Sequence, residues 1–237
     1  MPDRRGTGAA ALIVFAKAPT GGGVKTRLVP PLTPAEAAAL ADAFLRDGLA
    51  RYAAPGAFGE AVAVRLYLAG EGDLPPDVAP EGVSLHRQRG DGLGARMERA
   101  FVETFAGGYG RAVIVGTDHP TLPLDFLAEA FRALEAPRTA VIGPSDDGGY
   151  YALGLNDLPF GAPGLFAMDY SHAGVFDATL DRVLDAGLSA VVLPPWYDVD
   201  DAADLRRLLA DWRAGADVPA HTAASLKALL DAYPALL

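Results

Sequence analysis

Two of the three lysines in this chain flank a glycine-rich loop, which is the first place where chemistry is expected. Lys17 and Lys25 enclose the run 21–23, and Arg27 follows shortly after. Glycine lets backbone N–H groups approach a phosphate closely, and nearby cations supply charge. The alternative is a flexible surface turn, since the loop matches neither common glycine-rich phosphate motif. The predicted phosphate-binding residues are Lys17, Gly22, Gly23, Lys25 and Arg27.

Carboxylates in two other loops could hold a divalent cation. Asp118 comes directly after the apolar run 112–116, and Asp198 and Asp200 precede a predicted helix. Mg²⁺ prefers oxygen ligands and is commonly held between one or two carboxylates and a substrate phosphate. The alternating spacing of Asp198 and Asp200 sends both side chains to one side of an extended chain, as metal coordination or a hydrogen bond to Lys25 requires. We predict Asp118, Asp198 and Asp200 as ligands of Mg²⁺ or Mn²⁺.

Two further loops combine glycine with polar side chains. In the segment 88–96, glycines at a helix start would let a base or ribose lie against the backbone, and Gln88 could read a base edge; alternatively Asp91 is only a helix cap. In the segment 143–151, acids and tyrosines surround a Gly pair, although Asp-Gly is also a strong hairpin signal. His119 either contacts substrate or hydrogen-bonds within its own loop.

The composition describes a folded globular chain with an uneven charge distribution. Of the 237 residues, 51% are hydrophobic, which excludes disorder, and the formal charge is −10. Residues 1–118 carry 13 basic and 13 acidic side chains, whereas residues 119–237 carry 7 and 17. We expect no nucleic-acid partner, because binding a phosphate backbone needs clustered Lys and Arg. The acidic second half could instead contain metal-binding carboxylates that face the basic loop.

Cysteine usage and hydropathy bear on the compartment. The chain contains no cysteine, which excludes disulfides, thiolate catalysis and Cys-ligated zinc. We expect a cytoplasmic protein with no membrane partner, because no apolar stretch reaches 18 residues. The apolar run 9–16 is predicted to be a buried first strand rather than part of a signal peptide.

Strand-length apolar runs alternate with segments of helical period. The predicted strands are 11–16, 61–68, 83–86, 112–116, 139–143 and 190–193, and the predicted helices are 34–54, 93–105, 124–134, 174–186 and 202–212. Near-continuous hydrophobicity indicates strands covered on both faces, so we predict a three-layer α/β/α sandwich with a mostly parallel sheet. Its ligands are expected at the carboxyl ends of the strands.

The chain is expected to be a single domain. Its core spans about residues 11–212, and a final helix over 220–233 lies in the segment 217–237. The stretch 146–172 is less regular, with an aromatic hairpin followed by a loop. Thr33 and Glu36 form a capping box before the first helix, and Asp201 with Asp204 is suited to cap the last helix of the core.

Five segments in this order resemble the GT-A fold of the nucleotide-diphospho-sugar transferase superfamily. They are FAKAP…GVKTRL, QRGDGLGARM, VGTDHPTLP, GPSDDGGYYALGL and PPWYDVDDAADL, which together span about residues 12–209. Within that superfamily the chain is similar to the arsenosugar-type glycosyltransferases, which were once a domain of unknown function. It is also similar to 2-phospholactate guanylyltransferases and, more distantly, to molybdenum cofactor guanylyltransferases.

The resemblance implies a Rossmann-like fold and a role for each loop. Lys25 and Arg27 would hold the donor's phosphates, and Asp118 with Asp198 or Asp200 would hold Mg²⁺. The base or ribose would be lined by Asp91, Gly92, Leu93 and Gly94. The acceptor would face Asp147, Gly148, Gly149 and Tyr150.

The chain departs from the family pattern at two histidines. The family usually reads Ser-Asp-Ser-Pro where this chain has Thr117 to Pro120, and Trp-Ser-Thr where it has Tyr170 to His172. His119 and His172 thus replace small polar residues at acceptor positions. We take this to favour a small anionic acceptor such as a phosphate, phosphonate or carboxylate.

Two transfer reactions fit these residues. In nucleotidyl transfer, an acceptor oxyanion attacks the α-phosphorus of a nucleoside triphosphate and pyrophosphate leaves; Lys25, Arg27 and Asp118 would be the catalytic residues. In glycosyl transfer, the acceptor attacks the sugar of a nucleotide sugar, and Asp147 is a candidate base. Because two cations suit a triphosphate, the sequence favours nucleotidyl transfer, with glycosyl transfer second and a non-catalytic nucleotide-binding module third. The oligomeric state is open, with a homodimer as one option.

Overall fold

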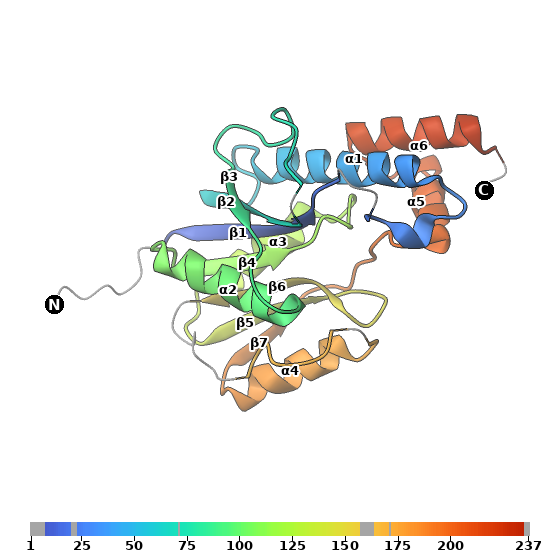
Figure 1. Ribbon diagram of the computed structural model, residues 1–237. Helices are drawn as coiled ribbons and strands as arrows, with labels where there is room; N and C mark the ends of the chain where they lie inside the picture. The colour runs from blue at the N-terminus through green and yellow to red at the C-terminus, as the bar shows by residue number, and fades with distance from the viewer. Residues whose placement is uncertain (1–7, 20–22, 71, 157–163, 171, 235–237) are drawn as a thin grey trace.

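A computed structural model of the chain describes residues 8–19, 23–70, 72–156, 164–170 and 172–234, so the predicted phosphate-site residue Gly22 lies outside the described residues. Seven strands of the described chain form one sheet in the order β3-β2-β1-β4-β6-β5-β7 (Figure 1). They are β1 Ala10–Lys17, β2 Val62–Ala69, β3 Ser84–Arg87, β4 Arg111–Val115, β5 Thr139–Pro144, β6 Tyr150–Asn156 and β7 Ser189–Val192.

The sheet is mostly parallel, as expected. β1 pairs in parallel with both β2 and β4, and β5 pairs in parallel with β7. β6 lies between β4 and β5 and is antiparallel to both. The expected aromatic hairpin is confirmed, because β6 follows β5 directly as its antiparallel partner. The stretch is more regular than expected, since Tyr150–Asn156 is a full strand in the sheet interior.

Helices cover both faces of the sheet, which confirms the three-layer architecture. They are α1 Pro34–Tyr52, α2 Leu93–Ala106, α3 Leu124–Ala133, α4 Val175–Asp185, α5 Ala202–Arg213 and α6 Ala220–Ala232. Alternate strand residues face opposite layers: Leu12 and Val14 pack with α1 and α3, whereas Ile13 packs with α2 and α4. This two-residue period explains why the buried strands are apolar throughout.

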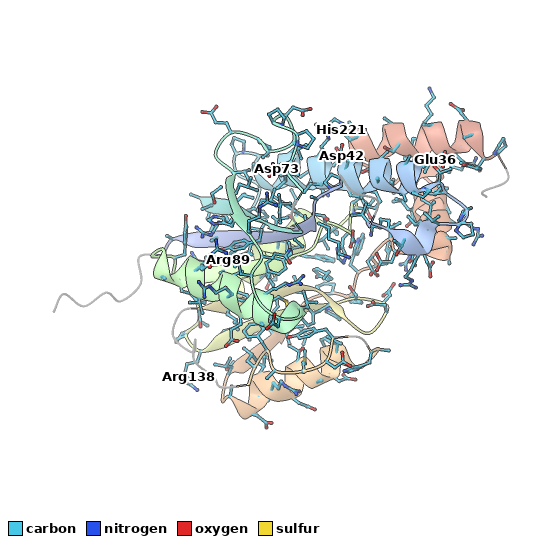
Figure 2. All side chains as sticks on the ribbon, in the orientation of Figure 1. Glu36, Asp42, Asp73, Arg89, Arg138 and His221 are labelled. Atoms are coloured by element: carbon cyan, nitrogen blue, oxygen red, sulfur yellow. The ribbon has the colours of Figure 1, made fainter. Side chains whose placement is uncertain are left out.

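A third apolar cluster extends the sandwich beyond the sheet. Leu40 and Phe44 of α1 pack with Leu205 of α5 and Leu226 of α6. α6 lies along α1, where Asp42 and His221 mark the two helices (Figure 2). The buried carboxylate of Asp47 accepts the backbone N–H groups of His221 and Thr222 and so caps the start of α6.

Helix starts follow the expected caps in two cases and not in a third. Thr33 with Glu36 and Asp201 with Asp204 both form complete capping boxes. The alternative of Asp91 as a cap of α2 is wrong, because the cap residue is Gly92 at φ 88° and no side chain bonds to the helix start. No helix among the described residues is long and apolar enough to cross a membrane.

Candidate functional site at the carboxyl edge of the sheet

A cavity of about 530 Å³ opens at the carboxyl ends of β1 and β4. At this point the chain turns from β1 toward one edge of the sheet and from β4 toward the other, which is where ligands gather in open α/β sheets. Its lining contains most of the predicted site residues, namely Lys17, Gly23, Lys25, Arg27, Gln88, Leu93, Asp118, His119, Asp147, Gly149, Tyr150, His172, Asp198 and Asp200.

Lys25 is the centre of this site. Its ammonium lies 2.6 Å from Asp118 Oδ1 and 2.8 Å from Asp200 Oδ1, and it donates to the Val199 carbonyl at 2.7 Å. Only 4% of the side chain is exposed, and the ammonium lies 5.7 Å from the centre of the Phe44 ring. A lysine has three N–H donors, so all three are occupied.

The chain reaches this position through a tight turn after the glycine-rich loop. Lys25 has φ 49°, in the left-handed region, and a single 3-10 turn, Thr26–Leu28, follows it. Leu28 is fully buried beside Leu40 and anchors the turn in the third apolar cluster. The turn thereby directs Lys25 inward, while Arg27 points to the cavity.

Electrostatic interactions keep Lys25 and its carboxylate partner Asp200 in their ionised forms. Burial alone would lower the pKa of Lys25, but the charges of Asp118 and Asp200 outweigh it, and the pKa lies above its ordinary value. Burial would likewise raise the pKa of Asp200, but Lys25 outweighs it, so the pKa is lowered. The two loops that carry these carboxylates are therefore tied to one cation.

Asp198 is held in a different state from Asp200. Burial and the neighbouring charges of Asp200 and Asp147 raise the pKa of Asp198 to about 7. Hydrogen bonding from Asp198 is in turn one of the influences that lower the pKa of Asp200. The predicted acid pair is thus one carboxylate that pairs with Lys25 and one that retains its proton to near neutral pH.

Backbone contacts fix the two carboxylate loops against each other. The Val199 N–H donates to the Asp118 carbonyl at 2.9 Å, so the loops lie side by side. The Asp200 N–H donates to Asp204 Oδ2 at 3.0 Å, which fixes this loop to the start of α5. The predicted use of Asp201 as a cap is confirmed, and it leaves Asp198 and Asp200 facing the cavity.

Arg51 also supports the Asp118 loop, and its contribution was not predicted from the sequence. Its guanidinium donates to the carbonyls of Pro120 and Leu122, each at 2.8 Å. Arg51 lies in the last turn of α1, far from the loop in sequence, and no motif marks it. It holds the Asp118 loop over the C-terminal end of α1.

Arg27 is the more accessible cation of the first loop. Its side chain is 65% exposed, donates to Asp201 at 3.1 Å and lies 4.0 Å from Asp200. Arg27 therefore matches the predicted phosphate-binding role more directly than Lys25, whose donors are all used. Lys17 and Arg96 add further cations to the cavity lining. Arg96 belongs to the segment 88–96, but the sequence analysis did not predict it as a site residue.

His119 lies buried in the cavity wall. Only 8% of the residue is exposed, and neither ring nitrogen has a hydrogen-bond partner among the described residues. Its ring meets Tyr151 edge to face at 5.8 Å between centroids. Burial, with a smaller effect of Lys25, lowers the pKa of His119 to about 4 despite the opposing charge of Asp118, so the imidazole is neutral.

Gly143 creates the space for the ring beneath His119. A Cβ at Gly143 would lie 2.3 Å from Tyr151 Cζ, so a side chain here would displace the tyrosine. Tyr151 also donates from its hydroxyl to the Pro194 carbonyl at 3.0 Å. The glycine therefore sets the position of Tyr151, and through it the position of His119.

The predicted hairpin brings two acids to different places. Asp147 lines the cavity, and its Oδ1 accepts the Gly149 N–H at 2.9 Å. Asp146 instead pairs with Arg207 of α5 at 2.6 Å. Gly148 has φ 88°, and a Cβ there would lie 1.9 Å from the Ala173 carbonyl oxygen. The segment is thus a hairpin, as the Asp-Gly signal indicated, and Asp147 and Gly149 also line the cavity.

The segment expected to contact the base is only partly in the cavity. Gln88 lines it, but its amide nitrogen donates to the carbonyls of Ala16 and Tyr67 at 3.2 and 3.0 Å, so the amide donor is used to join strands. Leu93 is 46% exposed at the cavity. Gly94 is buried. A Cβ at this position would lie 2.2 Å from the Phe166 carbonyl oxygen, so no side chain fits there.

The segment 164–175 completes the cavity. His172 accepts the Gly174 N–H at Nδ1, 3.0 Å away. Tyr170, which was not selected as a site residue, lines the cavity beside Tyr150 and His172. Burial raises the pKa of both tyrosines, so both hydroxyls remain protonated. Only the unusual concentration of aromatic residues in this stretch could have indicated Tyr170.

The donor set fits a hard divalent cation shared with a ligand phosphate. Asp118 and Asp200 supply carboxylate oxygens, and Asp118 retains 44% exposure toward the cavity. No three His, Asp or Glu side chains in the part of the chain that is described are already grouped as a complete metal site. Mg²⁺ is commonly bound through one or two carboxylates plus substrate phosphate oxygens, and Asp118 and Asp200 could supply the carboxylates.

Comparison with known proteins agrees with this fold. A family described as "uncharacterized protein conserved in bacteria (DUF2064)" matches residues 55–172. A "putative nucleotide-diphospho-sugar transferase" from Desulfovibrio desulfuricans G20 is 30% identical, with a TM-score of 0.80, over 96% of each chain. A comparison with curated proteins gave no match.

More distant structures share the fold alone. The protein Rv0371c from Mycobacterium tuberculosis H37Rv is 18% identical with a TM-score of 0.51, covering 87% of this chain and 100% of that chain. A cytidylyltransferase from Leptospira borgpetersenii is 11% identical with a TM-score of 0.51, covering 96% and 95%. These likenesses confirm the expected Rossmann-like α/β fold.

Proposed function

The chain belongs to the DUF2064 family of proteins conserved in bacteria, and on that premise we propose that it is a glycosyltransferase that uses a nucleotide-diphospho-sugar donor. The 30% identical relative, named as such a transferase, supports the transferase class over nearly the whole chain.

One observation carries the proposal. Asp118 and Asp200 come from loops after β4 and β7, yet a single buried ammonium holds both at the mouth of a 530 Å³ cavity. A cavity of this size matches a small-molecule ligand. Paired hard oxygen ligands beside exposed Arg27 are suited to a diphosphate brought in with a divalent cation.

The state of Lys25 favours glycosyl over nucleotidyl transfer. The sequence favoured nucleotidyl transfer because two cations, Lys25 and Arg27, suit the charge of a triphosphate. In the structure Lys25 already neutralises Asp118 and Asp200, and its three N–H donors are used. Arg27 is then the accessible cation of that pair, which suits a diphosphate leaving group.

The reaction requires one bond to form and one to break. An acceptor hydroxyl oxygen bonds to the anomeric carbon of the donor sugar, the bond from that carbon to the phosphate oxygen breaks, and nucleoside diphosphate leaves. The hydroxyl proton passes to a base, for which Asp147 is suited because it lines the cavity and retains one oxygen beyond its bond to Gly149. Arg27 stabilises the charge on the departing diphosphate.

A divalent cation held by Asp118 and Asp200 would supply Lewis-acid stabilisation of the leaving diphosphate. Lys25 positions the two carboxylates to bind that cation. Arg51 fixes the loop of Asp118 through the carbonyls of Pro120 and Leu122. The protein's own contribution is therefore mainly the placement of charge before the donor binds.

Product analysis tests this function. The protein is incubated with Mg²⁺, each common nucleotide sugar and a panel of acceptors, and in parallel with each nucleoside triphosphate and the same acceptors. Release of nucleoside diphosphate from a nucleotide sugar is expected. Release of pyrophosphate from a triphosphate, without turnover of nucleotide sugars, would overturn the proposal.

Nucleotidyl transfer is the second candidate, and one observation favours it. Lys17, Arg27 and Arg96 all line the cavity, so a longer polyphosphate would also find cationic partners there. That reaction predicts pyrophosphate as product. Nucleotide binding without any turnover would instead support a non-catalytic module.

A further inference from the structure

The hairpin between β5 and β6 carries two neighbouring acids that make different contacts. Asp147 lines the cavity, whereas Asp146 pairs with Arg207 of α5 at 2.6 Å. Because the two acids are adjacent in the chain, a contact that holds Asp146 also limits how far the carboxylate of Asp147 can move. The position of the proposed base therefore depends on what fixes Arg207.

Arg207 is held by a stack of aromatic rings. Its guanidinium lies 3.9 Å from the centre of the Tyr197 ring, and Tyr197 stacks on Trp196 at 5.8 Å between centroids. Trp196 in turn meets Phe126 of α3 edge to face at 5.7 Å. A cation is attracted to the face of an aromatic ring, so the stack orients Arg207 toward Asp146. We call Arg207, Tyr197 and Trp196 the outer clamp.

The hairpin is also joined to the segment 194–200, which carries acids of the proposed metal site. The Asp146 N–H donates to the Trp196 carbonyl, and the Trp196 N–H donates to the Pro144 carbonyl, each at 3.1 Å. The ion pair with Arg207 adds a side-chain contact at Asp146. The same residue is therefore held through its backbone and through its carboxylate.

Helix α4 holds the tip of the hairpin at a second point. The Phe176 N–H donates to the Gly148 carbonyl at 2.9 Å, and a Cβ at Gly148 would collide with Ala173. Removing Arg207 would therefore loosen the tip where it contacts α5 without releasing it from α4. The Arg207 and Asp146 side chains are about half exposed, and such ion pairs contribute little to global stability, so the protein should remain folded.

We propose that Arg207 is a positioning residue: through Asp146 it holds the carboxylate of Asp147 where the acceptor hydroxyl loses its proton. Among the described residues Arg207 does not line the cavity, so it acts without touching donor or acceptor. The inference rests on the proposed function, which makes Asp147 the base. Reacting groups must approach to about 3 Å, and a displacement on the order of 1 Å can cost a large factor in rate.

Replacing Arg207 should lower kcat more than it raises KM for the donor. Arg207→Met keeps a long side chain over Tyr197 but cannot pair with Asp146, so kcat should fall about tenfold while the donor KM changes less than about twofold. Arg207→Lys keeps the charge without the planar guanidinium and should recover part of the loss. Asp146→Asn should lose a similar factor, and the double variant no more than either, because both changes break one pair.

The test combines turnover with hydrogen exchange, which needs no turnover. Steady-state kinetics use nucleotide sugar with Mg²⁺, and hydrogen-exchange mass spectrometry follows peptides that cover residues 144–150 and 194–199. The matched control is Arg206→Met, because Arg206 is exposed on the same helix and makes no side-chain hydrogen bond or ion pair among the described residues. Arg207→Met should speed exchange in both peptides about threefold or more, whereas Arg206→Met should match the wild type in both assays.

Three results would overturn the positioning role of Arg207. They are faster exchange with unchanged kcat, a loss of kcat with unchanged exchange, and an equal loss in Arg206→Met. Pyrophosphate release from a triphosphate, or no turnover by the wild type, would instead overturn the proposed function and with it the base role of Asp147. In that event the exchange data alone would support or overturn the contact of Arg207 with the hairpin.

Discussion

Arg111 and Lys25 are buried basic side chains at opposite edges of the sheet, and they make similar interactions but have different roles. At the amino edge, Arg111 contacts Glu60 at 2.7 Å and donates to the carbonyls of Phe131 and Gly8. At the carboxyl edge, Lys25 contacts Asp118, Asp200 and the Val199 carbonyl. Both side chains are almost fully enclosed, at 11% and 4% exposure.

The difference lies in what surrounds each pair. Arg111 joins β4 to the loop before β2 and to the end of α3, where its carboxylate partner has a structural role. The Lys25 pair lines the cavity at the sheet's topological switch point, and Asp118 remains 44% exposed to it. Glu60 also lines a cavity, of about 620 Å³, so burial, charge pairing and a neighbouring cavity do not by themselves identify a site. The Lys25 cluster differs because one ammonium holds two carboxylates from separate loops at the carboxyl ends of the strands.

Replacing Asp118 should have the largest effect on activity. Asp118→Asn keeps the side chain's size but removes a metal-binding charge, so kcat should fall on the order of a thousandfold, or about 4 kcal/mol. Steady-state turnover with saturating nucleotide sugar measures the loss. Full Mg²⁺-dependent activity in this variant would contradict the role of Asp118 in metal binding.

Arg111→Met should affect stability instead. The change leaves Glu60 and two carbonyl groups without their partner, so the free energy of unfolding should fall by about 3 kcal/mol. Urea denaturation measures the fall, and kcat of the folded protein should be unchanged. A large loss of kcat with little loss of stability would reverse the roles assigned to the two edges.

Lys25→Met distinguishes the two edges through their response to metal. Without the ammonium, Asp118 and Asp200 repel each other, so the metal-free variant should lose about 2–3 kcal/mol of stability. Mg²⁺ can replace the missing charge and should restore part of the loss. Thermal unfolding with EDTA and with excess Mg²⁺ measures this; equal stabilisation of Arg111→Met by Mg²⁺ would contradict it.

Arg51→Lys tests the support of the Asp118 loop. Lysine retains the charge but cannot reproduce the planar fork that reaches both Pro120 and Leu122, so kcat should fall about tenfold. Arg46→Lys is the matched control, because Arg46 lies on the same helix but pairs with Asp42 and Asp77. Equal losses in both variants would indicate a general effect on α1.

Asp198 should give the smallest effect, visible in the pH dependence of stability. Burial and neighbouring carboxylates raise its folded pKa to about 7, above the unfolded value near 4, so the folded state binds an extra proton between these values. Stability should therefore fall by about 1–2 kcal/mol as pH rises through this window, after allowance for solvent screening.

Asp198→Asn should remove that fall in metal-free buffer and be more stable than the wild type at pH 7.5. At the amino edge Glu60→Gln should instead be less stable than the wild type at pH 7.5, because the Glu60 charge pairs with Arg111. Urea denaturation at pH 5 and 7.5 measures both. A destabilised Asp198→Asn at pH 7.5 would show that the Asp198 charge is favourable in the folded protein.

Local patterns predicted the architecture well, and most of the residues that they singled out line one cavity. The apolar runs identified β1 and β4, and Thr33 and Asp201 correctly marked helix starts. The two tyrosines and adjacent glycines correctly indicated a hairpin, but the length of β6 and its place inside the sheet were not predicted. Local periodicity does not report the pairing of β6 with β4, which ends 35 residues before β6 begins.

The roles within the site needed the tertiary structure. The alternating acids allowed a hydrogen bond to Lys25, and Asp200 accepts one at 2.8 Å. The sequence did not indicate that Asp118 shares the same ammonium, which the sequence analysis assigned to phosphate binding. Arg51 carries no motif because its partners are backbone carbonyls. The orphaned nitrogens of His119 also arise only from packing, since nothing local indicates that the loop leaves them unpaired.

The central claim is that the carboxyl-edge cavity binds a nucleoside diphosphate through Asp118 and Mg²⁺. Isothermal titration with UDP, GDP, CDP, ADP and TDP, with and without Mg²⁺, tests it most directly. At least one diphosphate should bind the wild type only with Mg²⁺, and Asp118→Asn should lose that dependence together with most of the affinity. Absence of binding by all five, or equal binding by wild type and Asp118→Asn in Mg²⁺, would contradict the account.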